Sequence, residues 1–235
     1  EKQKGEVVGG SYATKVEVNI AKHRNGPTKM DWSYSVGSNA DEIWHTRALF
    51  SREGVRTHES SNGTVSAVSE QLLKDKSYRW IVGKGRSFYG QPVPDKVEIE
   101  WVSYHDKKRY GITLELPKDL GKQMAQRYRL KGDRIAQRNY IALGLAPGGY
   151  VEVFLESPDP LPDVLIASGM AHEVTDDWYD KKVPLDSQYQ ERWASFDKNF
   201  RPYYDKYPIP IGEAWAPIMD TYRAAQPKTD TDPVY

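Results

Sequence analysis

Two alternating runs in the middle of this sequence constrain its fold more than any other feature. Within residues 95–104, Val97, Ile99 and Trp101 alternate with charged side chains, and residues 109–116 alternate in a similar way. Period-two alternation places every second side chain on the same face of a β-strand. Because only a short polar turn separates the two runs, they predict an antiparallel hairpin with one buried face.

Several other segments also have the composition of β-strands. Residues 139–145 and 150–155 flank an Ala-Pro-Gly-Gly turn and predict a second hairpin. The remaining predicted strands are residues 15–20, residues 78–82 (closed by Gly83 and Gly85) and residues 164–174.

Helical patterns in the first three quarters of the chain are short. Residues 67–76 predict one short helix. Pro117 ends the strand before it and opens a central amphipathic helix, in which Leu120, Met124 and Tyr128 share one face.

The character of the sequence changes from residue 176 onward. Aromatic residues recur at helix-like spacing over residues 186–200 and 212–225, with a turn-rich stretch between them. We therefore predict an α+β fold whose mostly antiparallel β body covers residues 1–175 and includes the central helix. A helical C-terminal segment over residues 176–225 packs on this body, and residues 226–235 form a flexible tail.

Charge and cysteine content exclude several functional classes. The 33 basic and 33 acidic residues balance, whereas nucleic-acid binders carry a basic excess, so no nucleic-acid partner is predicted. The absence of cysteine removes disulfides, thiol catalysis and zinc-thiolate sites. No apolar run reaches about 18 residues, the length that indicates a membrane-spanning helix.

The sequence contains no complete catalytic or cofactor motif. Ser168 lacks the first glycine of a nucleophile elbow, and His172-Glu173 lacks the second histidine of a zinc-protease helix. The Gly83-Lys84-Gly85 turn lacks the third glycine and the helix of a dinucleotide-binding loop. We therefore predict no catalytic residues, no metal and no cofactor.

Two surfaces are candidate binding sites. The first is the basic stretch over residues 118–138, represented by Lys122, Arg127 and Arg129, which could bind an acidic partner or lipid headgroups. The alternative is the solvated face of an amphipathic helix.

The second candidate is an acidic and aromatic loop made of Asp176, Asp177, Trp178 and Tyr179. Trp and Tyr flanked by acids are typical of protein-binding hot spots. Packing of the C-terminal aromatic residues into a core is the alternative.

Residues 90–157 resemble a bacterial family of predicted lipoproteins, the domain of unknown function DUF2931. The resemblance rests on residues 91–95, 99–104, 107–110 and above all 141–155. Its characteristic positions are structural: Pro94, Trp101, Tyr104, Gly144, Pro147, Gly148 and Gly149. Glycines suit turns with positive φ, and Pro147 fixes the entry to the turn, so these positions identify a scaffold.

The resemblance implies a periplasmic protein tethered to a bacterial membrane only through an N-terminal lipid anchor. A signal peptide and a lipidated cysteine would precede a mature chain beginning at Glu1. Relatives of this kind resemble immunity proteins, so we expect a non-catalytic protein that binds and neutralises a type VI secretion effector, most specifically a phospholipase. The alternatives are an envelope lipoprotein that binds a carbohydrate or a lipid, and a hydrolase assembled from residues distant in sequence.

Overall fold

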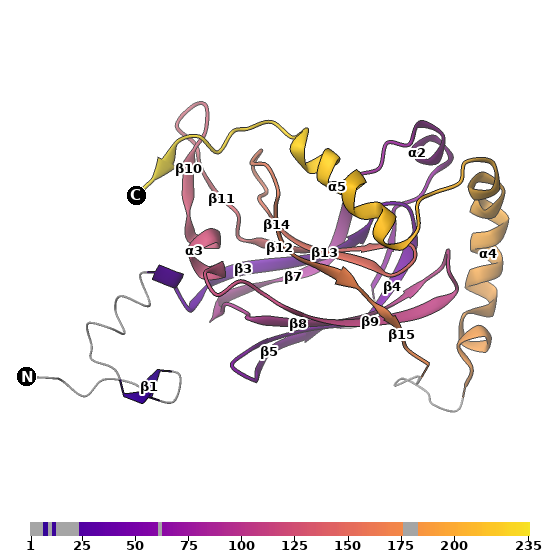
Figure 1. The fold of residues 1–235 in the computed structure, drawn as a ribbon, viewed down its shortest axis with the longest axis horizontal. Coiled ribbons are helices and arrows are strands. Elements are labelled where there is room, and N and C mark those ends of the chain that lie inside the picture. The colour runs from indigo at the N-terminus through magenta and orange to yellow at the C-terminus, as the bar shows by residue number, and fades with distance from the viewer. Residues whose placement is uncertain (1–6, 9–10, 13–23, 61–62, 176–182) are drawn as a thin grey trace, which may run out of the picture.

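The fold is α+β and consists mainly of two β-sheets that pack face to face (Figure 1). This computed structural model describes residues 7–8, 11–12, 24–60, 63–175 and 183–235. The predicted strand at residues 15–20 lies outside the described residues.

The first sheet has five strands and contains the only parallel pair among the described strands. Its order is β14 (Val164–Met170), β13 (Tyr150–Glu156), β12 (Tyr140–Ala146), β3 (Lys29–Ser38) and β7 (Ile81–Pro92). The pair β12 and β3 is parallel, and all other neighbours are antiparallel.

The second sheet has six antiparallel strands. Its order is β15 (His172–Glu173), β9 (Lys108–Glu115), β8 (Lys96–Ser103), β4 (Glu42–Arg52) and β5 (Val55–Ser60), and β6 (Gly63–Ser66) also pairs with β4.

Small sheets occupy the periphery. β10 (Arg127–Arg129) pairs with β11 (Ile135–Gln137) and with β16 (Pro233–Val234), and β1 (Val7–Val8) pairs with β2 (Ser11–Tyr12). Residues 226–235, for which composition predicts a flexible tail, are therefore attached to the body. Besides the β16 pairing, Asp230 forms an ion pair with the buried Arg138 at 2.7 Å.

The main core lies between the two large sheets. The alternation that predicted the hairpins directs Val97, Ile99 and Trp101 of β8 into this core, where each is at most 1% exposed. The facing side chains come from the second predicted hairpin, β12 and β13, whose register runs from Tyr140 opposite Glu156 to Ala146 opposite Tyr150. Both predicted hairpins are confirmed.

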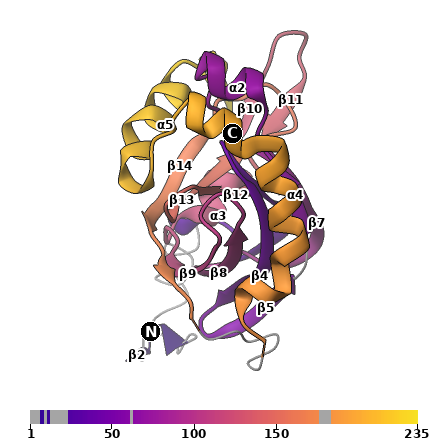
Figure 2. The ribbon, with the colours of Figure 1, turned by 90° about the vertical axis from the view of Figure 1, so that its right-hand side faces the viewer.

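A second core covers the outer face of the five-stranded sheet and continues over the end of the sandwich at which α4 lies (Figure 1). Helices α2 (Glu70–Asp75), α4 (Leu185–Lys206) and α5 (Trp215–Ala224), with the short 3-10 turn η1 (Gly212–Ala214), contribute to it (Figure 2). Trp215 and Met219 of α5 are fully buried there.

One buried carboxylate ties α5 to the sheet beneath it. Glu152 of β13 is 0% exposed and accepts hydrogen bonds from the Trp80 indole at 3.0 Å and the Tyr150 hydroxyl at 2.6 Å. Arg223 of α5 completes the cluster with an ion pair of 2.6 Å. Because a buried charge is costly unless it is paired and hydrogen-bonded, this cluster fixes where α5 docks.

The predicted end of one strand is wrong. Strand β7 starts at Ile81 and continues through Gly83 and Gly85 to Pro92. A Cβ atom at Gly85 would lie 1.7 Å from the carbonyl oxygen of Tyr34 on β3. This glycine therefore permits a close approach of two strands rather than ending one.

Two predicted helix boundaries also differ. Helix α3 (Leu120–Ala125) is shorter than predicted, because residue Tyr128 belongs to β10 and pairs with Ala136 of β11. Helix α4 is longer than predicted and continues through Pro202 to Lys206.

Candidate functional site

An open groove of about 440 Å³ lies between α4 and the strands β4 and β6. Its aromatic lining consists of Tyr104, Phe196 and Phe200. Its polar and charged lining consists of Glu42, Thr64, Glu191, Arg192, Ser195 and Asn199.

The sequence of α4 explains which side chains reach the groove. Arg192, Ser195 and Asn199 recur at spacings of three and four, so they lie on one face of the helix. Aromatic contacts hold that face in position: the ring centroids of Tyr104 and Phe196 lie 5.8 Å apart, perpendicular to each other. The groove is therefore built on a helix and a sheet rather than on loops.

The charged residues of the groove are partly withdrawn from water. Burial raises the pKa of Glu42, opposed by a hydrogen bond from Ser66 and by the nearby charge of Arg192. The Arg192 guanidinium lies over the indole ring of Trp44, 4.1 Å from its centroid, in a cation–π contact.

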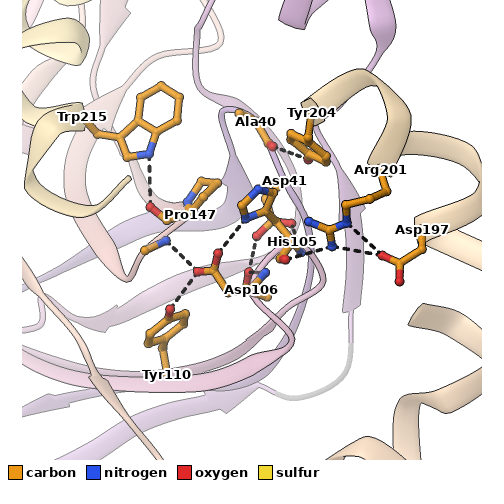
Figure 3. A network of polar contacts seen from close by, with 12 residues as sticks. Ala40, Asp41, His105, Asp106, Tyr110, Pro147, Asp197, Arg201, Tyr204 and Trp215 are labelled. Atoms are coloured by element: carbon orange, nitrogen blue, oxygen red, sulfur yellow. Dashed lines mark hydrogen bonds and ion pairs between the residues drawn. The ribbon is translucent and has the colours of Figure 1, made fainter. Parts of the chain in front are cut away.

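A polar network lies next to the groove, at the turn between β8 and β9 (Figure 3). The pairing of Ile43 with Ser103 brings Asp41 beside this turn. Asp41 is fully buried and accepts hydrogen bonds from the Ser103 hydroxyl at 2.6 Å and the His105 amide at 2.9 Å.

A second carboxylate, Asp106, stands on the other side of His105. It lies 2.7 Å from His105 Nδ1 and accepts hydrogen bonds from the Tyr110 hydroxyl and the Gly148 amide, each at 2.7 Å. The network thereby joins the β8–β9 turn to the β12–β13 turn.

Helix α4 is attached to the same network. The Tyr204 hydroxyl donates to the carbonyl of Ala40 at 2.6 Å, and Arg201 donates to the carbonyl of His105 at 3.0 Å while it pairs with Asp197 (Figure 3). The groove and the network therefore share their supporting elements.

The carboxyl groups of the buried Asp41 and the partly buried Asp106 have pKa values shifted in opposite directions. Burial and the neighbouring Asp106 raise the pKa of Asp41 to about 7. Burial also acts to raise the pKa of Asp106, but the hydrogen bonds from His105, Gly148 and Tyr110 outweigh it and lower that pKa below its ordinary value. When two carboxyl groups share a site, the repulsion between their negative charges drives their pKa values apart in this way.

The network does not have the geometry of a catalytic triad. The Ser103 hydroxyl is fully buried and donates to Asp41 rather than to His105, and it also accepts from the Asp106 amide at 3.0 Å. In a nucleophilic site the serine would be bonded to the histidine. The contacts of Asp41 with Ser103 and His105 instead join the start of β4 to the β8–β9 turn.

The acidic and aromatic loop Asp176, Asp177, Trp178 and Tyr179 lies outside the described residues. Within α4 and α5, the aromatic residues pack into the second core: Trp193 is 4% exposed.

The predicted basic surface is divided between elements. Lys122 lies on α3, whereas Arg127 and Arg129 lie on β10, and all three are exposed. Arg129 pairs with Asp133 and Asp232 at 3.7 and 3.6 Å, which offsets part of its charge. The stretch is thus neither one helix face nor a purely basic patch.

The positions that carry the family resemblance are structural. Trp101, Tyr104 and Pro94 are buried, and a Cβ atom on Gly144 would lie 2.7 Å from the Trp80 ring. Gly148 and Gly149 have φ values of 86° and 88°, which favour glycine, and the Pro147 carbonyl accepts from the Trp215 indole at 3.2 Å.

Comparison with protein families extends the resemblance far beyond these positions. The family described as "Protein of unknown function (DUF2931)" matches residues 12–212. The chain belongs to this family. The DUF2931 match spans both large sheets, the groove, the polar network and all of α4, whereas the sequence motifs covered only residues 90–157. No curated protein and no solved structure gave a significant match.

Sequence reasoning missed both the groove and the network of this DUF2931 protein. The adjacent His105 and Asp106 in a predicted turn were the one local signal. Asp41 and Arg192 reach the site only through the pairing of β4 with β8 and the docking of α4, neither of which leaves a local pattern.

Proposed function

We propose that this DUF2931 protein is a non-catalytic binding protein of the bacterial cell envelope that binds and neutralises a protein toxin. The groove beside α4 carries the proposal. The half-buried Phe200, over a floor of buried Tyr104 and Phe196, is surrounded by charged and polar side chains, an arrangement typical of a protein-binding hot spot with a polar rim. Such a surface needs rigid support, and α4 and the six-stranded sheet supply it.

The polar network supports binding rather than catalysis. Histidine and paired carboxylates are the groups that most often carry acid–base chemistry. Here His105, Asp41 and Asp106 bond to turns and to each other, so their hydrogen bonds are used to hold the scaffold.

The family resemblance supports a more specific form of the proposal. In that form the protein is an immunity protein of the periplasm, anchored by an N-terminal lipid, and its partner is a phospholipase effector of type VI secretion. No described helix is long and apolar enough to cross a membrane.

A second candidate is an envelope protein that binds a carbohydrate or a lipid. The groove volume of about 440 Å³ falls within the range of small-molecule pockets, roughly 300–1,000 Å³. The lining argues against it, because six of the nine lining residues are polar or charged, whereas small-molecule pockets are mainly apolar.

Co-expression tests the proposal. The full-length precursor is produced together with toxins encoded by adjacent genes and directed to the periplasm, and cell survival and toxin activity are measured. We expect survival, and a stoichiometric complex in size-exclusion chromatography and calorimetry. The second candidate would be favoured if there were no protection and no complex, and if a glycan or a phospholipid raised the thermal stability of the protein.

Matched variants then test the groove itself. Asn199→Arg places a bulky cation in the groove, whereas Gln190→Arg introduces the same side chain at an exposed position of α4 that does not line it. We expect the first variant to lose protection and the second to keep it, with equal thermal stability.

A further inference from the structure

The charges of the groove point to the chemistry of what it binds. Two carboxylates line it, Glu42 from β4 and Glu191 from α4, against the single base Arg192, whose charge acts on Glu42. The one lining base, Arg192, lies on the Trp44 ring. The groove is therefore a negative site with its own cation already engaged.

The position of Glu42 strengthens its attraction for a cation. Its carboxylate is partly buried, and desolvation is the main influence on it. Charge interactions are stronger in such surroundings than in open water. A cation placed beside it would recover the solvation that burial removed.

Aromatic rings provide the second element of recognition. Phe200 is the half-buried ring of the groove, whereas Tyr104 and Phe196 are each 2% exposed and form its floor. Ring faces attract cations, guanidinium groups above all because these are planar and weakly hydrated. The protein already uses this contact nearby, since the Arg201 guanidinium lies 5.9 Å from the Phe196 centroid and 5.7 Å from that of Tyr204.

We propose that the groove receives an arginine side chain from a protruding loop of the protein partner, with Glu42 and Glu191 pairing its guanidinium above the aromatic lining. This inference rests on the proposed function for the identity of the partner, but the arginine site is a property of the groove alone. The volume of about 440 Å³ leaves room for the backbone on either side of the inserted side chain.

Nuclear magnetic resonance titration of the full chain tests the site without any toxin. The probe is the capped tripeptide acetyl-Gly-Arg-Gly-amide, and its control carries citrulline, which keeps the shape of arginine and removes the charge. We expect saturable shifts at the Trp44 indole and at the Arg192 and Phe200 amides with the arginine peptide. The citrulline peptide should give at least tenfold weaker binding.

Conservative variants identify the carboxylates. Glu42→Gln and Glu191→Gln should each weaken the arginine peptide by about three- to tenfold, whereas Glu115→Gln, at a 77% exposed carboxylate on β9, should leave it unchanged. Equal shifts with citrulline, no saturable shifts in the groove, or full binding by both groove variants would each overturn the proposal.

The two proposals can fail separately. Arginine binding without any toxin partner would retain the site and reject the toxin-neutralising function. Protection that survives Asn199→Arg, combined with absent peptide binding, would retain the function and reject the site.

Discussion

Asp41 gives the stability of this protein a pH dependence of unusual sign. Its pKa of about 7 in the folded protein lies above the ordinary value of 3.8, so folding favours the protonated form. Between these two values the folded protein holds a proton that the unfolded chain has released, and the free energy of unfolding therefore falls as pH rises.

The size of the effect follows from the two pKa values. Each tenfold change in acidity constant corresponds to about 1.4 kcal/mol, so ionised Asp41 costs about 4 kcal/mol above pH 7. Over the experimental window from pH 5 to 8, the expected loss is about 2 to 3 kcal/mol. The lower limit of the window avoids Asp106, whose lowered pKa removes stability only below its ordinary value of 3.8.

Asp41→Asn removes the titrating group and keeps the shape of the side chain. The amide oxygen can still accept from the His105 amide, and the amide nitrogen can donate to the Ser103 hydroxyl oxygen. Urea unfolding of both proteins is measured at several pH values, and the variant free energy minus that of the parent is plotted. This difference cancels the contributions of titrating groups that behave alike in both proteins.

We expect the difference to rise with pH, by about 2 to 3 kcal/mol from pH 5 to pH 8. The variant should therefore gain relative to the parent in alkaline solution. Two parallel profiles would show that Asp41 does not titrate in this window, and the reasoning from its burial would be refuted.

Three further substitutions test the scaffold, each by urea denaturation. Glu152→Ala leaves the buried Trp80 and Tyr150 donors without their acceptor and Arg223 without one of its two carboxylate partners, and should cost about 3–5 kcal/mol. Asp220→Ala, at a side chain 63% exposed, should cost less than about 1 kcal/mol. Gly85→Ala forces a Cβ into a backbone carbonyl and should cost at least about 2 kcal/mol, while Gly83→Ala meets nothing within 4 Å and should be neutral. Trp215→Phe removes the indole hydrogen bond to the β12–β13 turn together with some packing, for a loss of about 1–3 kcal/mol. Equal losses in a variant and its control would contradict the first two assignments, and an unchanged midpoint the third.

The parts of the fold that could be predicted are those in which neighbours in sequence are neighbours in space. The hairpin β8–β9 follows from alternation on both sides of a short turn, and β12–β13 from two strands around Gly148 and Gly149. In each hairpin, the sequences of two consecutive strands and of the turn between them are sufficient to predict the pairing. The parallel pairing of β3 with β12 leaves no comparable pattern, because its partners are far apart in the chain.

Local signals were wrong where distant partners decide the structure. Glycine after a strand usually marks a turn, but at Gly85 the approach of β3 requires a residue without a side chain. Tyr128 continues a helical spacing with Leu120 and Met124, yet β11 and β16 offer its segment backbone partners on both sides.

The site escaped prediction for the same reason. Glu42 lies on β4, Arg192 on α4 and Tyr104 in the β8–β9 turn, and no local pattern links the three. The sequence marks Tyr104 only as a structural position of the family resemblance. The groove residues come together, and become partly buried, only after the six-stranded sheet has formed and α4 has packed against it.

The parallel pairing of β3 with β12 also determines how the chain must be assembled as it is made. The central strand of the five-stranded sheet, β12, pairs with β3, but strands β4 to β11 come between the two in the chain. The edge of β3 therefore stays unpaired on this side until β12 has been synthesised. The apolar outer face then stays uncovered until Trp215 and Met219 arrive near the C-terminus. Such non-local closure slows folding and exposes apolar surface meanwhile. The apolar surface of the strands made earlier therefore depends for its cover on residues as far along the chain as α5.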